Sequence, residues 1–489
     1  MFKPSLEEAK TYSADYARVP VTLEIMADTD TTIGLLARLE RRADCCFLLE
    51  SMEGGEKWGR YSFLGFGPAT TVTARGGVAT IVEKDGSSSI SDDPIGALRR
   101  QLCGGAPRIV GLPRFTGGLV GYFGYDIVRY FEDIPDENPD DAGFPDFCVM
   151  VADRLIVYDN RMQKLILIVN MQTQGDVEQN YQMACDALSE MMRIVRETGE
   201  AACPIRQAAK QKPEWKSNLT KEEFEEMVER TKAHIVDGDI FQVVLSQRFE
   251  AKMEGSLLDT YRVLRTANPS PYMYYLRFGS LEIAGASPET LLRLEQGTLE
   301  TLPIAGSRPR GQTPEQDAVL EQELLADEKE LSEHNMLVDL ARNDLGRVSE
   351  FGSVKVSDYK NVARYSQIMH LTTLVSSRLS QGQDAVSALG SVLPAGTLSG
   401  APKVMAMKLI DRYENRRRGP YGGAVGYLGF DGNMDVCITI RTIVKNGDMA
   451  YVQSGAGIVA DSVPETEYYE SCNKAKAVLL AAEKSVEIL

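Results

Sequence analysis

Two Glu-x-x-Glu pairs stand far apart in the sequence, each in a segment with helical periodicity. Glu330 and Glu333 lie in "EKELSEHNMLVDLARND", and Glu467 and Glu470 lie in "PETEYYESCNKAKAVLL". Residues three apart share one face of a helix, where a single pair is most often solvated surface, and Glu470 is also spaced for an ion pair with Lys474. Two pairs together supply the oxygen ligands on rigid helices that Mg²⁺ prefers. We therefore predict an Mg²⁺ site built from both helices.

Two further features suit the binding of an anion. Arg441 lies in the apolar strand "CITIRTIV" with no acidic neighbour in that strand, so its guanidinium is available to a carboxylate. The alternative is an edge-strand arginine that extends to solvent. Gly455-Ala456-Gly457, in "VQSGAGIV", allows close backbone approach and an anion-binding nest at the end of a strand, although an ordinary glycine turn is as compatible with the sequence.

Three other segments carry polar groups without a defined reaction. In "LPAGTLSGAPKVMAMKLI", Pro402 suits the first turn of a helix beginning near Ser399, which would place Thr397 near its positive end. His370 lies among apolar residues in a possible strand, where a lone histidine is more often part of the core. The stretch "PIAGSRPRG" forms an Ala-Gly-Ser turn beside two arginines and contains no nucleophilic side chain.

Composition limits the class of protein. The chain has 489 residues, of which 43% are hydrophobic and 25% charged, which is typical of a soluble protein of two or more domains. A net charge of −17 disfavours a nucleic-acid binder. No apolar run is long enough for a membrane span and the N-terminus lacks a signal-peptide core, so we expect a cytoplasmic protein. The eight cysteines are scattered without zinc spacing, which indicates reduced thiols.

The periodicity predicts how the elements are arranged. Residues 1–205 contain short β-rich runs and one helical pattern, and the aperiodic segment around 205 suits a connection between domains. Residues 206–489 begin with a helix capped by Thr220 and Glu223, continue with a β-meander that ends at "PIAGSRPRG", and close with a helix from Pro464. Strands in runs and helices in blocks predict an α+β fold of layered antiparallel sheets with helices outside.

The motifs taken together resemble the chorismate-binding enzyme family, and within it the members that form anthranilate. They are "PIAGSRPRG", "DEKELSEHNMLVDLARNDLGRV", "LPAGTLSGAPKVMAM", "YGGAVGYLGF", "CITIRT", "QSGAGIVADSVPE" and "ESCNKA", in this order. "LLES" and "NPSPYM" extend the resemblance to the tryptophan-inhibited members, so that it covers nearly the whole chain. The resemblance implies two intertwined subdomains: residues 1–205 would contribute a regulatory site and residues 206–489 the chorismate site.

The resemblance also implies roles for the residues singled out above. Glu333 and Glu470 would hold Mg²⁺, with Glu330 and Glu467 supporting it through water, and the metal would clamp the ring carboxylate of chorismate. His370 matches the histidine that abstracts a proton, and Glu330 is our candidate for protonating the leaving hydroxyl. The remaining contacts implied for chorismate are Gly306, Ser307, Tyr421, Arg441, Gly455, Ala456, Gly457 and Lys474, and Thr397 is counted with the catalytic residues.

Two positions indicate which reaction is carried out. The relative that makes 4-amino-4-deoxychorismate has a nucleophilic lysine where this chain has Ala305. The isochorismate-forming relatives have a water-activating lysine where this chain has Gln242. The resemblance therefore implies addition of ammonia at ring C2, loss of the C4 hydroxyl, and elimination of pyruvate to give anthranilate. Ser307 replaces the threonine usual in the family and keeps its hydroxyl.

The resemblance implies partners as well. The sequence shows no glutamine-amidotransferase pattern, so a separate glutaminase subunit would supply ammonia in a heterodimer or heterotetramer. Tryptophan would act as a feedback inhibitor, and the matching pocket residues are Glu50, Ser51, Pro271, Tyr272 and Met273.

Three alternatives remain open at this point. An aminodeoxyisochorismate synthase would share nearly every motif, an isochorismate-type isomerase is disfavoured by Gln242, and a non-catalytic tryptophan sensor would be expected to lack His370 or one of the metal glutamates.

Overall fold

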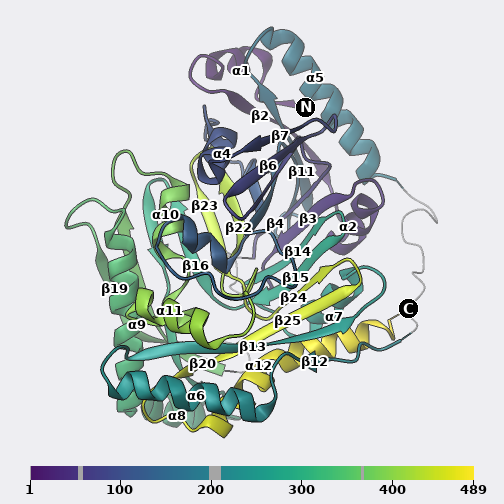
Figure 1. The fold of residues 1–489 in the computed structure, drawn as a ribbon. Helices are drawn as coiled ribbons and strands as arrows, with labels where there is room; N and C mark the ends of the chain where they lie inside the picture. The colour runs from purple at the N-terminus through teal and green to yellow at the C-terminus, as the bar shows by residue number, and fades with distance from the viewer. Residues whose placement is uncertain (1, 53–58, 198–210, 365–367, 489) are drawn as a thin grey trace.

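Two large antiparallel sheets form the centre of the molecule (Figure 1). The computed structural model describes residues 2–52, 59–197, 211–364 and 368–488. The first sheet runs in the order β1 (Phe2–Lys3), β2 (Arg18–Met26), β11 (Lys164–Gln172), β10 (Arg154–Asp159), β4 (Tyr61–Phe66), β3 (Cys45–Glu50), β14 (Tyr272–Phe278), β15 (Leu281–Ser287), β24 (Thr442–Asn446), β25 (Met449–Ile458), β13 (Gln242–Lys252) and β12 (Lys216–Ser217), and β21 (Gly400–Ala401) pairs with β13.

The second sheet runs in the order β18 (Ile304–Pro309), β20 (Ile368–Arg378), β17 (Thr298–Thr301), β16 (Thr290–Glu295), β23 (Met434–Ile438), β22 (Ala424–Gly429), β8 (Gly118–Phe123), β9 (Phe147–Ala152), β5 (Thr70–Arg75), β6 (Val78–Glu83) and β7 (Ser88–Ser91), and β19 (Lys355–Arg364) pairs with β20. Both sheets combine strands from before and after residue 205. Residue 205 itself lies outside the described residues, and the division there stays a prediction.

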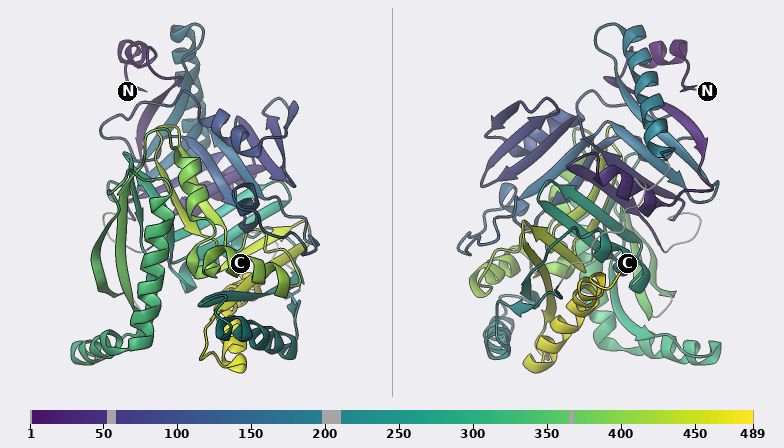
Figure 2. Two further views of the ribbon diagram at one scale, coloured as in Figure 1. Left: turned by 60° about the vertical axis from the view of Figure 1, so that its left-hand side comes forward. Right: turned by 90° about the vertical axis from the view of Figure 1, so that its right-hand side faces the viewer.

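Helices cover the outer faces of both sheets (Figure 2). They are α1 (Leu6–Tyr12), α2 (Thr32–Glu40), α4 (Pro94–Leu102), α5 (Val177–Val195), α6 (Lys221–Val236), α7 (Leu258–Ala267), α8 (Pro314–Ala326), α9 (Glu328–Gly346), α10 (Ala385–Val392), α11 (Lys403–Tyr413) and α12 (Pro464–Ser485), with 3-10 turns η1 (Tyr125–Tyr130) and η3 (Gly396–Leu398). The predicted α+β fold of layered antiparallel sheets with helices outside is therefore confirmed.

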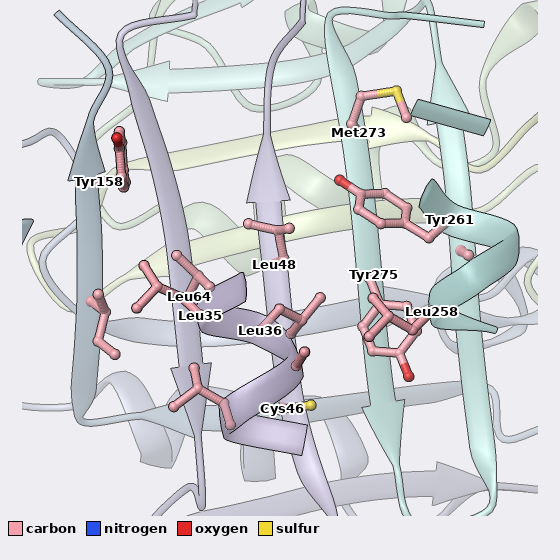
Figure 3. Close-up of a cluster of buried hydrophobic side chains, with 14 of the residues drawn as sticks. Leu35, Leu36, Cys46, Leu48, Leu64, Tyr158, Leu258, Tyr261, Met273 and Tyr275 are labelled. Atoms are coloured by element: carbon pink, nitrogen blue, oxygen red, sulfur yellow. The ribbon is translucent and has the colours of Figure 1, made fainter. Parts of the chain in front are cut away.

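The core has three main layers. One apolar cluster, which includes Phe47, Phe63, Val120 and Val425, fills the space between the two sheets. A second lies between the first sheet and helices α2, α5, α7 and α12, and Figure 3 shows part of it where α2 and α7 lie over β3, β4 and β14. The third covers the second sheet beneath α4, α9 and α10. Burial on both faces explains why many strands are continuously apolar.

Local sequence signals fixed several helix ends as expected. Thr220 caps α6, and its side chain and that of Glu223 bond each other's backbone amides in a capping box. The last helix begins at Pro464, where a missing N–H costs nothing. In contrast, the helix expected from Ser399 begins at Lys403, because Thr397 belongs to η3 and Gly400–Ala401 pair with β13 as β21.

Two predicted strands are each divided between the sheets. The segment "MDVCITIRTIV" forms β23 in the second sheet and β24 in the first, and the break falls at residues 439–441. The predicted meander changes sheet in the same way between β15 and β16. The segment "PIAGSRPRG" is not a loop, because residues 304–309 form β18 and pair with β20, with a bulge between Ala305 and Ser307. These breaks arise from tertiary packing, which hydrophobic periodicity does not encode.

Within the described part of the chain, no helix has both the length and the apolar character required to cross a membrane.

Candidate active site

Two of the connections between the sheets lie next to each other. One joins β15 to β16 through Glu289, and the other joins β23 to β24 through residues 439–441. The amide of Ala286 donates a hydrogen bond to the carbonyl oxygen of Arg441 at 3.2 Å. The amide of Ile438 donates one to the carbonyl oxygen of Glu289 at 3.0 Å. The backbones of Glu289 and Arg441 are thereby held side by side at the junction of the two sheets.

The carboxyl group of Glu289 is suited to donate a proton. Burial raises the pKa of Glu289 to about 7, although a hydrogen bond from Thr397 and the charges of Lys474 and Arg441 act to lower it. Thr397 Oγ1 donates this bond to Glu289 Oε1 at 3.0 Å. A carboxyl group that is partly protonated at neutral pH can act as a general acid.

Glu289 is not among the residues predicted from the sequence. The segment "GASPETLLRL" lies inside the predicted meander, where periodicity does not single out its acidic residue. The available signal was Pro288, because a proline inside an apolar run indicates that a strand is interrupted.

A wide, open depression of about 620 Å³ adjoins this junction and is lined by positive charge. Arg441 and Lys474 both face it, together with Glu470 from α12. The Nδ2 atom of Asn268, also in the lining, is buried without a hydrogen-bond partner in the structure. Two cations and an unsatisfied amide donor favour an anionic ligand with more than one acceptor group.

Gly455, Ala456 and Gly457 lie inside β25 rather than at its end. They pair regularly with β13, from Ser246 opposite Gly455 to Val244 opposite Gly457. On the other side, β24 pairs with β25 only as far as Val452, so residues 453–458 have no neighbouring strand there among the described elements. The expected anion-binding turn is therefore a strand edge, with alternate backbone amides directed to the side on which β24 ends.

His370 and Gly306 meet across the β18–β20 pair. The two ring nitrogens of His370 are distinguished by a contact of 3.1 Å between Nδ1 and the carbonyl oxygen of Gly306, which requires Nδ1 to carry the proton. Burial and the charge of Arg441 lower the pKa of His370, while the Gly306 contact raises it. A neutral imidazole with Nε2 as the basic nitrogen follows, as a general base requires. Ser307 is exposed and lies opposite His370 in the register.

The predicted metal glutamates form two separate pairs. Burial raises the pKa of Glu330, and the negative charge of Glu333 raises it further. Burial also raises the pKa of Glu467. A hydrogen bond with Ser462 acts to lower this pKa, and the negative charge of Glu470 acts to raise it. The charge of Lys329 on α9 acts on Glu467 on α12, so the first turns of these helices lie within electrostatic reach of each other.

The carboxylate oxygens of the two glutamate pairs are the kind of ligand that a hard cation prefers, although the two pairs do not converge on one position. Within the described ranges, no group of three or more His, Cys, Asp or Glu side chains is placed to hold a metal ion. Glu333 accepts a hydrogen bond from Gln242 Nε2 at 3.4 Å, and the Oε1 atom of Gln242 is buried with no partner. Glu470 pairs with Lys474 at 2.7 Å. Repelling carboxylates and an unsatisfied amide oxygen are compatible with a hydrated Mg²⁺ between α9 and α12.

Tyr421 lies apart from the depression. Its side chain is buried and lines a small cavity with Thr439 and Arg418. The amide of Gly422 donates to the carbonyl oxygen of Thr439 at 3.0 Å, so this segment runs beside the connection that carries Arg441.

A second cavity, of about 280 Å³, lies between the sheets, and we call it the regulatory cavity after the role that the sequence predicts for its residues. All five residues predicted for tryptophan line it, namely Glu50, Ser51, Pro271, Tyr272 and Met273. Aromatic walls come from Tyr61, Phe63 and Tyr427, and charged groups include Arg60, Arg114 and Asp435. Glu50 is buried and accepts hydrogen bonds from Thr32, Tyr261 and Arg265 at 3.1, 2.6 and 2.7 Å.

The depression is suited to an anionic small molecule. Residues 44–480 match the model of a family described as chorismate binding enzyme, and the chain belongs to this family. It is 49% identical to anthranilate synthase component 1 of Acetivibrio thermocellus over 495 residues, covering 100% of both chains. It is 45% identical to that of Aquifex aeolicus, covering 99% of this chain and 98% of the other.

Solved structures agree with the fold. Component I of anthranilate synthase from Streptococcus pneumoniae superimposes with a TM-score of 0.78 at 38% identity, covering 87% of this chain and 95% of that one. The menaquinone-specific isochorismate synthase of Escherichia coli shares the fold alone, with a TM-score of 0.70 at 19% identity over 98% of both chains.

Proposed function

We propose that this chain is the chorismate-converting component of an anthranilate synthase, a lyase that catalyses the first step of tryptophan biosynthesis. The supporting observation is identity of 42–49% over essentially the whole length of curated component 1 proteins. The geometry agrees, because Arg441 and Lys474 line one depression that suits an anionic substrate such as chorismate. Relatives with other reactions carry lysines at the positions of Ala305 and Gln242. Because this chain lacks both lysines, ammonia is the nucleophile that we assign.

In the first step, ammonia forms a bond to ring C2 while the C4–oxygen bond breaks, and the hydroxyl leaves as water after receiving a proton. The sequence favours Glu330 as the donor. We assign Glu289 instead, because Arg308 lies 3.5 Å from Glu330 and stabilises its charged form. Burial raises the pKa of Glu289 to about 7, and its Oε1 accepts a hydrogen bond from the neutral hydroxyl of Thr397.

In the second step, the proton at C2 is removed, the enolpyruvyl group leaves as pyruvate, and the ring becomes aromatic. Nε2 of His370 is the base that we assign to this step, since Nδ1 is directed to the carbonyl oxygen of Gly306. The charge of Arg441, which lines the depression, acts to lower the pKa of His370.

Replacing His370 by Gln is expected to lower anthranilate formation about 100-fold, because general acid–base catalysis commonly contributes at least this much. The intermediate, aminodeoxyisochorismate, should accumulate, since the first step does not use this imidazole. Chromatography of quenched reactions measures both compounds. His234→Gln, on α6 and bonded to Asp239, is the matched control. Full anthranilate formation by His370→Gln would remove this assignment.

Mg²⁺ belongs to the proposal as the cofactor. Glu333 and Glu470 would hold it, with Glu330 and Glu467 supporting through water. When bound, it would neutralise the ring carboxylate and orient the ring. The protein itself contributes the arrangement of α9 and α12, whose first turns lie within electrostatic reach of each other.

Ammonia would come from a separate glutaminase subunit, in a heterodimer or heterotetramer. We also assign the complex to the cytoplasm, which suits the seven described cysteines, all of them free thiols.

The test of the function uses the purified chain with chorismate, Mg²⁺ and an ammonium salt at alkaline pH. Anthranilate fluorescence and pyruvate release should rise together. Accumulation of aminodeoxyisochorismate without pyruvate would identify the synthase that stops after the first step, and isochorismate would identify the isomerase. Binding of tryptophan without any consumption of chorismate would identify a sensor.

Tryptophan is the inhibitor that we propose for the regulatory cavity. Its aromatic walls suit an indole ring, and its acidic and arginine side chains suit an amino acid's two charges. Replacing Tyr61 by Ala should raise the tryptophan concentration for half-inhibition about 10-fold, because one aromatic wall is lost. The KM for chorismate should stay the same. Tyr359→Ala, on the exposed strand β19, is the control; unchanged inhibition in Tyr61→Ala would contradict the placement.

A further inference from the structure

One strand presents two tyrosines to the regulatory cavity. Tyr272 and Tyr274 of β14 both line that cavity. Tyr275, which follows Tyr274, has its side chain on the opposite side of the sheet, toward α7 and α2 (Figure 3). The two hydroxyls therefore extend on the side where the two sheets pack together.

The ring of Tyr274 reaches across one whole strand. Tyr274 pairs with Gly285 of β15, and Gly285 pairs with Thr442 of β24. A Cβ atom at Gly285 would lie 2.5 Å from Tyr274 Oη, so only a glycine leaves room for the ring. Tyr274 Oη lies 2.6 Å from Thr442 Oγ1, and both side chains are buried.

Thr442 closes the turn that carries Arg441. Its Oγ1 donates to the carbonyl oxygen of Ile440 at 2.8 Å, so the hydrogen bond spans the arginine. Tyr274 is then the donor to Thr442, whose hydroxyl proton is already used. Arg441 has a φ of +50°, a left-handed conformation that is unfavourable for any residue other than glycine unless its surroundings hold it.

Tyr272 makes the equivalent contact at the other connection. Its hydroxyl donates to Asp435 Oδ1 at 2.8 Å and lies 3.0 Å from Thr290 Oγ1. Thr290 directly follows Glu289, the proposed proton donor. The regulatory cavity and the active site are therefore linked by two tyrosine–threonine contacts, one beside Glu289 and one beside Arg441.

We propose that Tyr272 and Tyr274 are positioning residues: through Thr290 and Thr442 they fix the backbones of Glu289 and Arg441, so that a ligand in the regulatory cavity acts on both. This inference rests on the proposed function for the roles of Glu289 and Arg441. It assigns a different consequence to each contact, because Arg441 would bind chorismate and Glu289 would protonate it.

The experiment measures kcat and KM of full-length variants with chorismate, Mg²⁺ and ammonium. Thr442→Val and Tyr274→Phe should each raise the KM for chorismate about 10-fold with kcat nearly unchanged, as expected when one hydrogen bond that orders a binding group is lost. Thr290→Val should lower kcat about 10-fold with KM nearly unchanged. Thr442→Ser and Thr290→Ser keep the hydroxyls and should restore wild-type values.

Two controls separate positioning from general destabilisation. Tyr275→Phe removes a buried hydroxyl from the same strand on its opposite face, where it bonds Glu40 and Glu282; it should lower the thermal midpoint and leave both kinetic constants unchanged. Tyr274→Phe/Thr442→Val should be no worse than Thr442→Val alone, since that single variant already removes the contact between the two side chains.

Unchanged constants in the valine variants, serine variants as impaired as the valines, or additive effects in the double variant would each overturn the inference. If the wild-type chain lacked turnover, the proposed function would fail instead. Calorimetric titration with chorismate would then still test the Arg441 contact, because Thr442→Val must bind it more weakly than Thr442→Ser.

Discussion

Replacing Glu289 by Gln is expected to lower kcat about 1,000-fold, within the range that a positioned general acid contributes. Glutamine keeps the size of the side chain and its contact with Thr397 but has no proton to donate. The KM for chorismate should change little, since Arg441 and Lys474 remain. Anthranilate fluorescence under saturating chorismate and ammonium gives the rate.

The pH dependence provides a sharper test of the same residue. The pKa of Glu289 is raised to about 7, so its protonated, active form decreases as the pH rises through that value. With the concentration of free ammonia held constant, kcat of the wild-type chain should therefore fall on the alkaline side, and Glu289→Gln should lack this fall. A bound dianionic substrate would shift the midpoint upward.

Glu295→Gln provides the matched control for Glu289, because it removes a carboxylate from the end of the following strand, β16. Wild-type kcat in Glu289→Gln would contradict the assignment and return Glu330 as the candidate.

The second large effect is expected at the metal glutamates. Glu333→Gln and Glu470→Gln should each reduce turnover at least 1,000-fold, because a lost metal clamp removes several kcal/mol of charge stabilisation. Removal of divalent ions by a chelator should have the same effect on the wild-type chain, and Mg²⁺ should reverse it. Calorimetric titration with Mg²⁺ measures binding directly and should show none in either variant.

Glu328→Gln and Glu465→Gln are suitable controls, because both lie in the first turns of the same two helices. The double variant Glu333→Gln/Glu470→Gln should be no less active than either single variant, since the two side chains act through one ion. Full Mg²⁺-dependent activity in either single variant would contradict the metal assignment.

The sequence predicted the parts of the site that depend on local signals. Glu330, Glu333, Glu467 and Glu470 were placed on helices by periodicity, and α9 and α12 are where that pattern indicates. The resemblance supplied the roles of His370 and Thr397, which periodicity alone left undecided. Local pattern and family motif agreed at these positions because each residue lies within, or immediately beside, one regular element.

The sequence did not predict the junction between the sheets. An apolar strand keeps the same pattern whether it stays in one sheet or passes into another, so "CITIRTIV" gave no sign of the break at Arg441. Glu289 was missed for the same reason, and its raised pKa depends on burial between segments more than 100 residues apart in the chain. The approach of α9 to α12 is likewise a tertiary property.

The shared sheets also restrict how such a protein can change over time. Strand β3 pairs along its length with β14, and β8 pairs with β22, so each sheet is completed by segments from both halves of the sequence. Exchange of the first half between distant relatives would have to preserve two β-edges in register as well as the ligand contacts. The proposed inhibitor site and the catalytic site are thus expected to be inherited together, and variation is expected to accumulate by single substitutions instead of by recombination of modules.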